Sequence, residues 1–267
     1  MQDTITKTPK LEDSRILYED DEHQYIWFGW EEEEGTESFV QTNQCLILNH
    51  DQGYFFDPGG TYVFHHVLEN IARYVNPRQL RYIIATHQDP DVCSSIPYWM
   101  KATDAELLIS RLWLHFVSHF GLEDVSRVLP VPDGGVRIKL NSGDELLMIP
   151  AHFLHSEGNF CIYDSRSQIL FSGDIGAAIF PHGERYLFVE DFQQHLHYCA
   201  GFHKRYMHSN RLCRMWAERV AKLPIRMIVP QHGAIYAGEQ VGQFLSWFRD
   251  LKCGGDYAEQ IYANERF

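Results

Sequence analysis

Four apolar runs in this sequence each end in side chains that can bind a metal ion. The runs, with the residues that follow them, are "YIIAT" before His87, Asp89 and Asp91, "LLMIPAHFL" before His155, "ILFSG" before Asp174, and "MIVPQ" before His232. Short apolar runs bounded by turn residues are typical of buried strands. A metal ion needs ligands from distant segments to converge within about 2 Å of one point. One histidine at a strand end is usually structural, but six such residues in one pattern predict a metal site at a shared sheet edge.

The rest of the chain predicts two groups of short strands, each followed by helices. Residues 15–60 and 137–174 contain most of the strands, with further strands at 81–86, 105–110 and 225–231. Helical spacing of apolar residues predicts helices over 61–75, 92–103, 111–121, 191–223 and 238–251. This order indicates an α/β (α+β) protein with two sheets and helices packed outside them. We expect a single domain over 1–267, with residues 1–14 flexible.

Charge and composition exclude several classes of partner. The net charge is −13, whereas nucleic acids and anionic membrane surfaces require basic patches. There is no apolar run of about 18 residues and no basic segment followed by an apolar one, so we expect a cytoplasmic chain without a membrane span. The six cysteines form no CxxC pair, which favours buried, reduced thiols over a thiolate metal site.

The first ligand cluster carries a resemblance to a known family. The segment His87-Gln88-Asp89-Pro90-Asp91-Val92 resembles the HxExDH motif of the flavodiiron branch of the metallo-β-lactamase fold, with Asp89 in place of the glutamate. The turns "DPGG", "FSGD" and "PQHG" are similar to turns of the same family. The resemblance implies an αββα sandwich with a dinuclear metal site at the edge of its two sheets.

The resemblance also implies how the ligands divide between two iron ions. One iron would take His87, Asp89 and His155, and the other Asp91 and His232, with Asp174 bridging them. Val92 stands where the family motif has its last histidine, which leaves the second iron an open coordination position. His152 is an alternative to His155. Three imidazoles and three carboxylates favour iron or manganese, while zinc remains an alternative.

Without room for a flavodoxin domain, the chain resembles the stand-alone oxygen-binding diiron proteins (ODP). The resemblance implies a sensor that binds O2, or alternatively NO, at a ferrous pair and reports it to a signalling or chemotaxis partner; relatives are often homodimers. Tyr206 is the candidate for a hydroxyl near bound O2. Two alternatives stay open. One is an O2 or NO reductase with an external electron donor, and the other is a dinuclear metallohydrolase.

Overall fold

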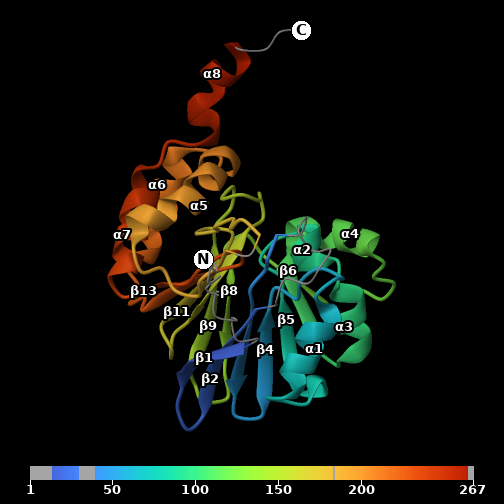
Figure 1. The fold of residues 1–267 in the computed structure, drawn as a ribbon. Coiled ribbons are helices and arrows are strands. Elements are labelled where there is room, and N and C mark those ends of the chain that lie inside the picture. Colours follow the sequence, from blue (N-terminus) through green and yellow to red (C-terminus); the bar gives the residue numbers. More distant parts are fainter. Residues whose placement is uncertain (1–13, 30–39, 183, 264–267) are drawn as a thin grey trace, which may run out of the picture.

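The structure is a computed structural model that describes residues 14–29, 40–182 and 184–263. The expectation of a flexible N-terminus falls on residues that lie, apart from Ser14, outside this part of the chain. Figure 1 shows two sheets stacked face to face between two groups of helices. Helices α1, α3 and α4 lie beside the first sheet, and α5, α6 and α7 cover the second. The predicted αββα sandwich is confirmed.

Within the described residues, the first sheet holds seven strands in the order β1-β2-β3-β4-β5-β6-β7, and the second holds six in the order β13-β12-β11-β10-β9-β8. The strand bounds of the first sheet are Ser14–Glu19, His23–Phe28, Gln44–Asn49, Gln52–Phe56, Leu80–Ile84, Glu106–Ser110 and Val128–Val131 for β1 to β7. Those of the second are Val136–Lys139, Glu145–Pro150, Phe160–Asp164, Ile169–Gly173, Met227–Pro230 and Tyr236–Ala237 for β8 to β13. Neighbours from β4 to β7 run parallel, as do β11 and β12. The carboxyl ends of these parallel strands point the same way, toward the edge where the predicted ligands follow.

The helices differ from the predicted ones mainly where the chain breaks them into shorter pieces. The α-helices are α1 Phe64–Ala72, α2 Pro90–Cys93, α3 Ile96–Ala102, α4 Leu114–Val117, α5 Phe192–Tyr206, α6 Asn210–Val220, α7 Glu239–Asp250 and α8 Ala258–Ala263. Four 3-10 turns lie at Pro77–Gln79, Arg111–Trp113, Ser118–Phe120 and Gly254–Tyr257. The helix expected over 111–121 is thus a single α-helical turn with 3-10 turns on both sides.

The single long helix expected over 191–223 is wrong. Helix α5 ends at Tyr206 and α6 begins at Asn210, because Met207 adopts an extended backbone and pairs with Leu154 as an isolated bridge. The amide of His208 then donates to the carbonyl of Phe153. Apolar periodicity continues across this break, so it could not reveal the contact. The helix expected over 92–103 is likewise two helices, because the amide of Ser95 donates to the carbonyl of Gly59 and not to the preceding helical turn.

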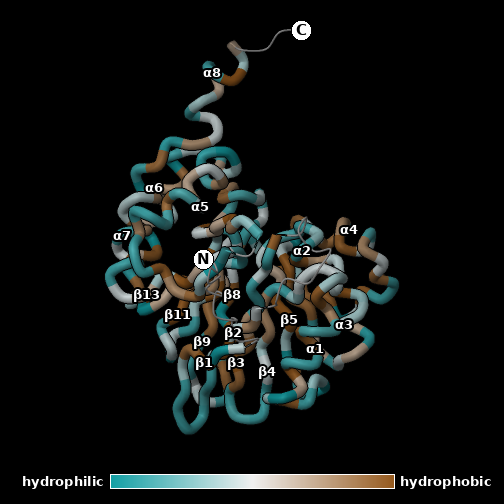
Figure 2. Tube along the Cα trace, viewed as in Figure 1, coloured by the Kyte–Doolittle hydropathy of each residue, from teal (hydrophilic) through white to brown (hydrophobic). Residues whose placement is uncertain are grey.

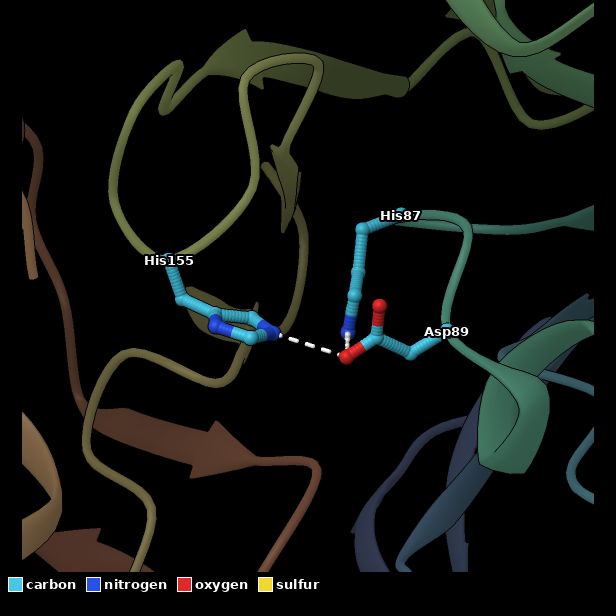
Figure 3. A group of neighbouring side chains, drawn as sticks. All are labelled: His87, Asp89 and His155. Atoms are coloured by element: carbon cyan, nitrogen blue, oxygen red, sulfur yellow. Dashed lines mark hydrogen bonds and ion pairs between the residues drawn. The ribbon is translucent and has the colours of Figure 1, made fainter. Parts of the chain in front are cut away.

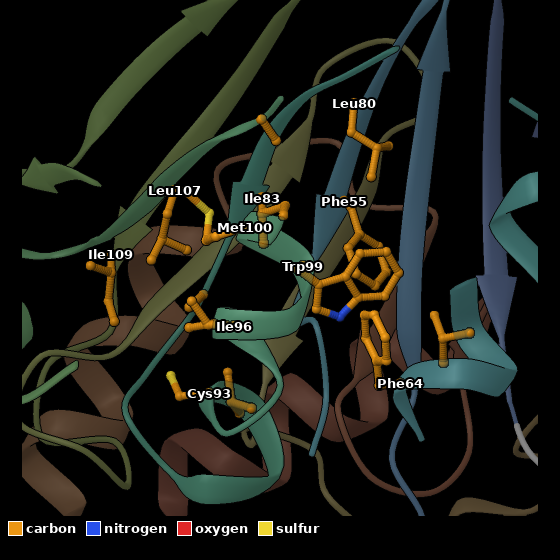
Figure 4. Close-up of a cluster of buried hydrophobic side chains, with 14 of the residues drawn as sticks. Phe55, Phe64, Leu80, Ile83, Cys93, Ile96, Trp99, Met100, Leu107 and Ile109 are labelled. Atoms are coloured by element: carbon orange, nitrogen blue, oxygen red, sulfur yellow. The ribbon is translucent and has the colours of Figure 1, made fainter. Parts of the chain in front are cut away.

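Three apolar clusters hold the layers together. One fills the space between the sheets and includes Phe56, Ile84 and Phe171. The second packs α1 and α3 on the first sheet, with Trp99 over Phe55 at 4.7 Å between ring centroids (Figure 4). The third lies between the second sheet and α5, α6 and α7. Figure 2 shows the same division, with hydrophobic strands inside and hydrophilic hairpin turns at the lower end.

Each layer buries only one face of its helices, which is what the sequence periodicity predicts. All six cysteines are free and buried. In the part of the chain that the structure describes, none of the helices is long and apolar enough to cross a membrane.

Candidate metal centre

The six predicted ligands all lie at one edge of the two sheets, each shortly after a strand. His87 follows β5 of the first sheet, with Asp89 at the start of α2 and Asp91 within it. The other three follow strands of the second sheet, with His155 after β9, Asp174 directly after β11, and His232 after β12. Segments far apart in sequence therefore converge on one place.

The first group of ligands consists of His87, Asp89 and His155 (Figure 3). Nε2 of His155 is 2.8 Å from Oδ2 of Asp89, and Nε2 of His87 is 3.8 Å from the same oxygen. One ligand atom from each residue lies within 4.8 Å of the others. Spacings of this size fit three ligands around a single metal ion, with each ligand atom about 2.0–2.2 Å from it.

Asp174 lies between this group and a second pair of side chains. Its Oδ2 is 3.8 Å from Nε2 of His87 and 3.5 Å from Nε2 of His155. Its Oδ1 is 3.7 Å from Nε2 of His232, which is itself 3.2 Å from Oδ2 of Asp91. The two oxygens of one carboxylate thus face two different sets of ligands, which is the arrangement a bridging ligand requires.

Two of the histidines are held so that Nε2 is free to bind a metal. Nδ1 of His87 lies 2.9 Å from the hydroxyl of Thr86, and that hydroxyl donates to Asp57 at 2.8 Å, so it accepts from His87. Nδ1 of His232 lies 2.8 Å from the carbonyl of Gln41 and must donate to it. In both rings Nδ1 carries a proton, so Nε2 is the nitrogen that can bind a metal once it carries no proton. Metal-binding histidines are held in the same way in other proteins.

Buried polar atoms without a protein partner indicate that the site is built for an ion. His87 is 1% exposed and Asp174 is 3% exposed. Among the described residues, Nε2 of His87 and Oδ1 of Asp174 have no hydrogen-bond partner. Leaving such atoms unpaired costs about 1–3 kcal/mol each. A metal ion would satisfy both, and the donor set of imidazoles and carboxylates suits iron or manganese.

The charges of the site are strongly coupled. Burial alone would lower the pKa of His232, but the hydrogen bond to Asp91 and the charge of Asp174 outweigh it and raise that pKa to about 9. Burial likewise opposes the net rise in the pKa of His155, which comes from Asp89 and Asp174. Both shifts favour the protonated form of the ring among the carboxylates. Metal binding must displace those protons.

Backbone strain also marks the site. His155 has a φ of 53°, in the left-handed region that costs a residue with a side chain about 1–2 kcal/mol. Gly173, directly before Asp174, has a φ of 62°, and a Cβ atom there would lie 3.0 Å from Oγ1 of Thr86. The glycine therefore permits the close approach of the two sheets that brings Asp174 to His87.

His152 and Val92 occupy other environments. Nε2 of His152 lies 2.9 Å from the carbonyl of Asp133, so His152 donates to that loop. Val92 is fully buried and packs in the cluster between the first sheet and its helices. The ring of Tyr206 lies edge-on to the ring of His155 at 5.6 Å and is stacked on Phe202. Tyr206 is 52% exposed, so it is at the open side of the site.

Sequence reasoning missed the groups that orient the ligands. Asp57 is fully buried and accepts from both the amide and the hydroxyl of Thr86, at 2.7 and 2.8 Å. Burial raises its pKa to about 6. The buried Gln231 lies 3.3 Å from Oδ2 of Asp91 through its Nε2. The Asp-Pro-Gly turn that ends β4 was the available signal for Asp57, because it places a carboxylate directly after a buried strand, as at Asp174.

Together, these layers and the ligand-bearing edge define a metallo-β-lactamase-like protein with a candidate metal centre. The family model described as ODP family beta lactamase matches residues 40–233, so the chain belongs to the ODP family. The chain is 46% identical to the chemotaxis sensor ODP, solved as a peroxy diiron species, with a TM-score of 0.84 over 94% of this chain and 100% of the sensor. The apo state of the sensor from T. denticola also matches at 46% identity and a TM-score of 0.84, over 93% of this chain and 98% of that one.

More distant relatives share the fold. A mutant flavo di-iron protein from Thermotoga maritima is 19% identical, with a TM-score of 0.72 over 88% of this chain and 60% of its own. An uncharacterised protein of Methanocaldococcus jannaschii is 23% identical over 229 residues, which are 78% of this chain and 53% of that protein. The chain therefore spans about half the length of this curated relative.

Proposed function

We propose that this chain is an oxygen sensor that binds O2 at a pair of ferrous ions. The six side chains that hold the ions are His87, Asp89, His155, Asp91, His232 and Asp174. The observation that carries the proposal is the position of Asp174, whose two oxygens lie 3.5 and 3.7 Å from histidines of different groups. The likeness to a sensor solved as a peroxy diiron species supports iron and O2 as the partners.

A ferrous pair supplies the electrons and the open coordination positions that O2 binding requires. The residues of the chain prepare the site for it. Thr86 and the carbonyl of Gln41 hold the rings of His87 and His232 with their Nε2 atoms toward the centre. Tyr206, at the open side beside His155, is the candidate donor of a hydrogen bond to O2.

The experiment that tests the proposal is anaerobic reconstitution with ferrous iron. We expect two irons per chain after desalting, and an absorption band that develops when air is admitted and persists for minutes. Protein loaded with zinc is the matched control, because zinc has no redox chemistry and its spectrum should not respond to O2. Rapid bleaching to a featureless ferric spectrum would favour a reductase that needs an external donor. Tight zinc binding with no uptake of iron would favour the hydrolase.

The signalling part of the proposal has its own test. A sensor must differ in conformation between its oxygen-free and oxygen-exposed states for a partner to distinguish them. We expect hydrogen exchange of the ferrous protein to change on exposure to O2, around the loop of His155 and the adjoining α5. Identical exchange in both states would contradict a reporting role. The proposal also includes a single domain over 1–267, a cytoplasmic location and a homodimer. Gel filtration with light scattering tests the homodimer.

A further inference from the structure

Gly176 lies two residues after Asp174, and side chains from two other elements hold both of its backbone polar groups. Its amide donates to Nε2 of His203 on α5 at 2.8 Å. Its carbonyl accepts from the hydroxyl of Tyr236 on β13, also at 2.8 Å. These two side chains thus make the hydrogen bonds to Gly176 that backbone groups of a neighbouring strand or helical turn make in regular structure.

The turn that contains Gly176 joins two of the candidate ligands. The amide of Ala177 donates to the carbonyl of Asp174 at 3.1 Å. The amide of Ala178 donates to the carbonyl of His232, also at 3.1 Å. Residues 174–178 therefore form a second connection between the backbones of Asp174 and His232, beside the pairing of β11 with β12, and the position of Gly176 bears on the distance between those two ligands.

The hydrogen bonds of His203 define its protonation. Nδ1 lies 2.7 Å from the carbonyl of Cys199, so it must carry the proton, and Nε2 is left as the acceptor that Gly176 needs. Burial lowers the pKa of His203 to about 4, which keeps the ring neutral at ordinary pH. Trp247 and Phe248 enclose the ring edge-on, at 5.4 and 5.7 Å between centroids.

Tyr236 is held just as firmly. Its ring is stacked on Phe244 at 4.6 Å. Its hydroxyl donates to Gly176 and lies 3.1 Å from Nε2 of His195, from which it accepts. His195 in turn lies 2.7 Å from the hydroxyl of Tyr186 through its Nδ1. His203 thus fixes the amide of Gly176, and Tyr236 fixes its carbonyl.

We propose that His203 and Tyr236 are positioning residues that set the spacing of Asp174 and His232 and so determine how tightly the second metal ion binds. This inference rests on the proposed function only in taking Asp174 and His232 as metal ligands. The first ion, at His87, Asp89 and His155, depends less on the turn. Removing a group that orients a metal ligand typically costs 10–100-fold in affinity.

The test compares His203→Leu with His203→Gln by anaerobic titration calorimetry with ferrous iron. Leucine fills the space without an acceptor, whereas glutamine can present an oxygen to the amide of Gly176. We expect His203→Leu to weaken the second binding step by about 10–100-fold and the first step far less. His203→Gln should restore most of the loss. The thermal stability of the metal-free protein is measured for both variants as well. A purely structural role would change this stability without separating the first and second iron-binding steps.

Tyr236→Phe is the second variant, because it keeps the stacked ring and removes only the hydroxyl. We expect Tyr236→Phe to weaken binding of the second iron in the same way. If His203→Leu does not fold, Tyr236→Phe alone tests whether these contacts to Gly176 control the second iron. Two unchanged binding steps in the folded variants would overturn the inference, as would glutamine failing to rescue. Wild-type protein that binds two ions without responding to O2 would contradict the proposed function and leave this inference standing.

Discussion

At the scale of single residues, Asp174 is the candidate ligand whose two oxygens face different histidines. We expect Asp174→Ala to abolish binding of the ion pair, because the Asp174 carboxylate lies 3.5 Å from His155 of one group and 3.7 Å from His232 of the other. His152→Ala is the matched control, since His152 donates to the carbonyl of Asp133 instead. Metal analysis after anaerobic reconstitution measures both. Two irons per chain in the Asp174 variant would disprove the bridging role, and loss of an iron in the control would make His152 a ligand.

A second residue-scale prediction concerns His195. Burial lowers its pKa to about 4, whereas a histidine in the unfolded chain titrates near 6.5. Between these values the unfolded chain binds more protons, so the free energy of unfolding falls as the pH is lowered from about 6.5 toward 4. We expect His195→Phe to make metal-free protein less sensitive to acid in that window. Urea unfolding at several pH values measures the slope, and His197→Phe, at an exposed position on the same helix, is the control. Equal slopes in wild type and His195→Phe would contradict the prediction.

At the scale of elements, the break between α5 and α6 connects the C-terminal segment to the loop of His155. His208 donates to Phe153 through its amide and accepts from the amide of Gly255 at 2.8 Å. Gly254 has a φ of 47°, and a Cβ atom there would lie 2.1 Å from the carbonyl oxygen of Met207. The loop of His155, the break between α5 and α6 and the C-terminal segment therefore pack so closely that only glycine fits at position 254.

We therefore expect Gly254→Ala to lower the free energy of unfolding by more than the roughly 1–2 kcal/mol of backbone strain alone. Gly242→Ala, within α7 and with no atom near its added methyl group, should instead be stabilising by about 0.5–1 kcal/mol. Urea unfolding midpoints of the two variants measure the contrast. A neutral Gly254→Ala would mean that this contact does not hold the segments together.

At the scale of the whole molecule, Arg166 ties the two sheets together at the end away from the candidate metal centre. It binds both oxygens of Asp20 in the β1–β2 turn, at 2.7 and 2.8 Å, and reaches Asp144 of the second sheet at 3.0 Å. The hydrogen bond from Arg166 holds the pKa of Asp20 well below its usual range. The stabilisation by the ion pair of Arg166 with Asp20 is therefore present at neutral pH, and it is lost as the pH falls through the depressed pKa of Asp20.

We expect Arg166→Met to lower the free energy of unfolding by roughly 1–2 kcal/mol at neutral pH, allowing for partial exposure. The difference from wild type should shrink in acid, from about pH 4 downward, because Asp20 takes up a proton there in the unfolded chain but not yet in the folded protein. Ferrous iron binding should not change, because the centre is at the other end of the sheets. Arg137→Met removes an exposed pair with Glu145 and serves as the control. A pH-independent difference would contradict the role of Asp20.

The two sheets could be predicted because the evidence for them is local. Runs such as 82–86 and 169–173 are short, apolar and followed by turn residues, and the observed strands β5 and β11 lie within or close to these two runs. Strand β7, at Val128–Val131, lies outside the predicted strands. The candidate ligands were visible for the same reason, since each is a polar residue just after such a run. The helix over 191–223 was not predictable in detail, because its break at Met207 depends on a contact with Leu154 far away in sequence.

The sequence by itself determined the layers, the edge at which ligands gather and the six residues that gather there, because alternating apolar and polar character is a property of neighbouring residues. Only the tertiary structure decided which atoms face one another. It placed both oxygens of Asp174 between two groups of ligands, set His152 against Asp133, and brought His203 and Tyr236 to Gly176. Contacts of this kind join residues 19 to 60 positions apart and follow from how whole layers pack, which short-range patterns do not record.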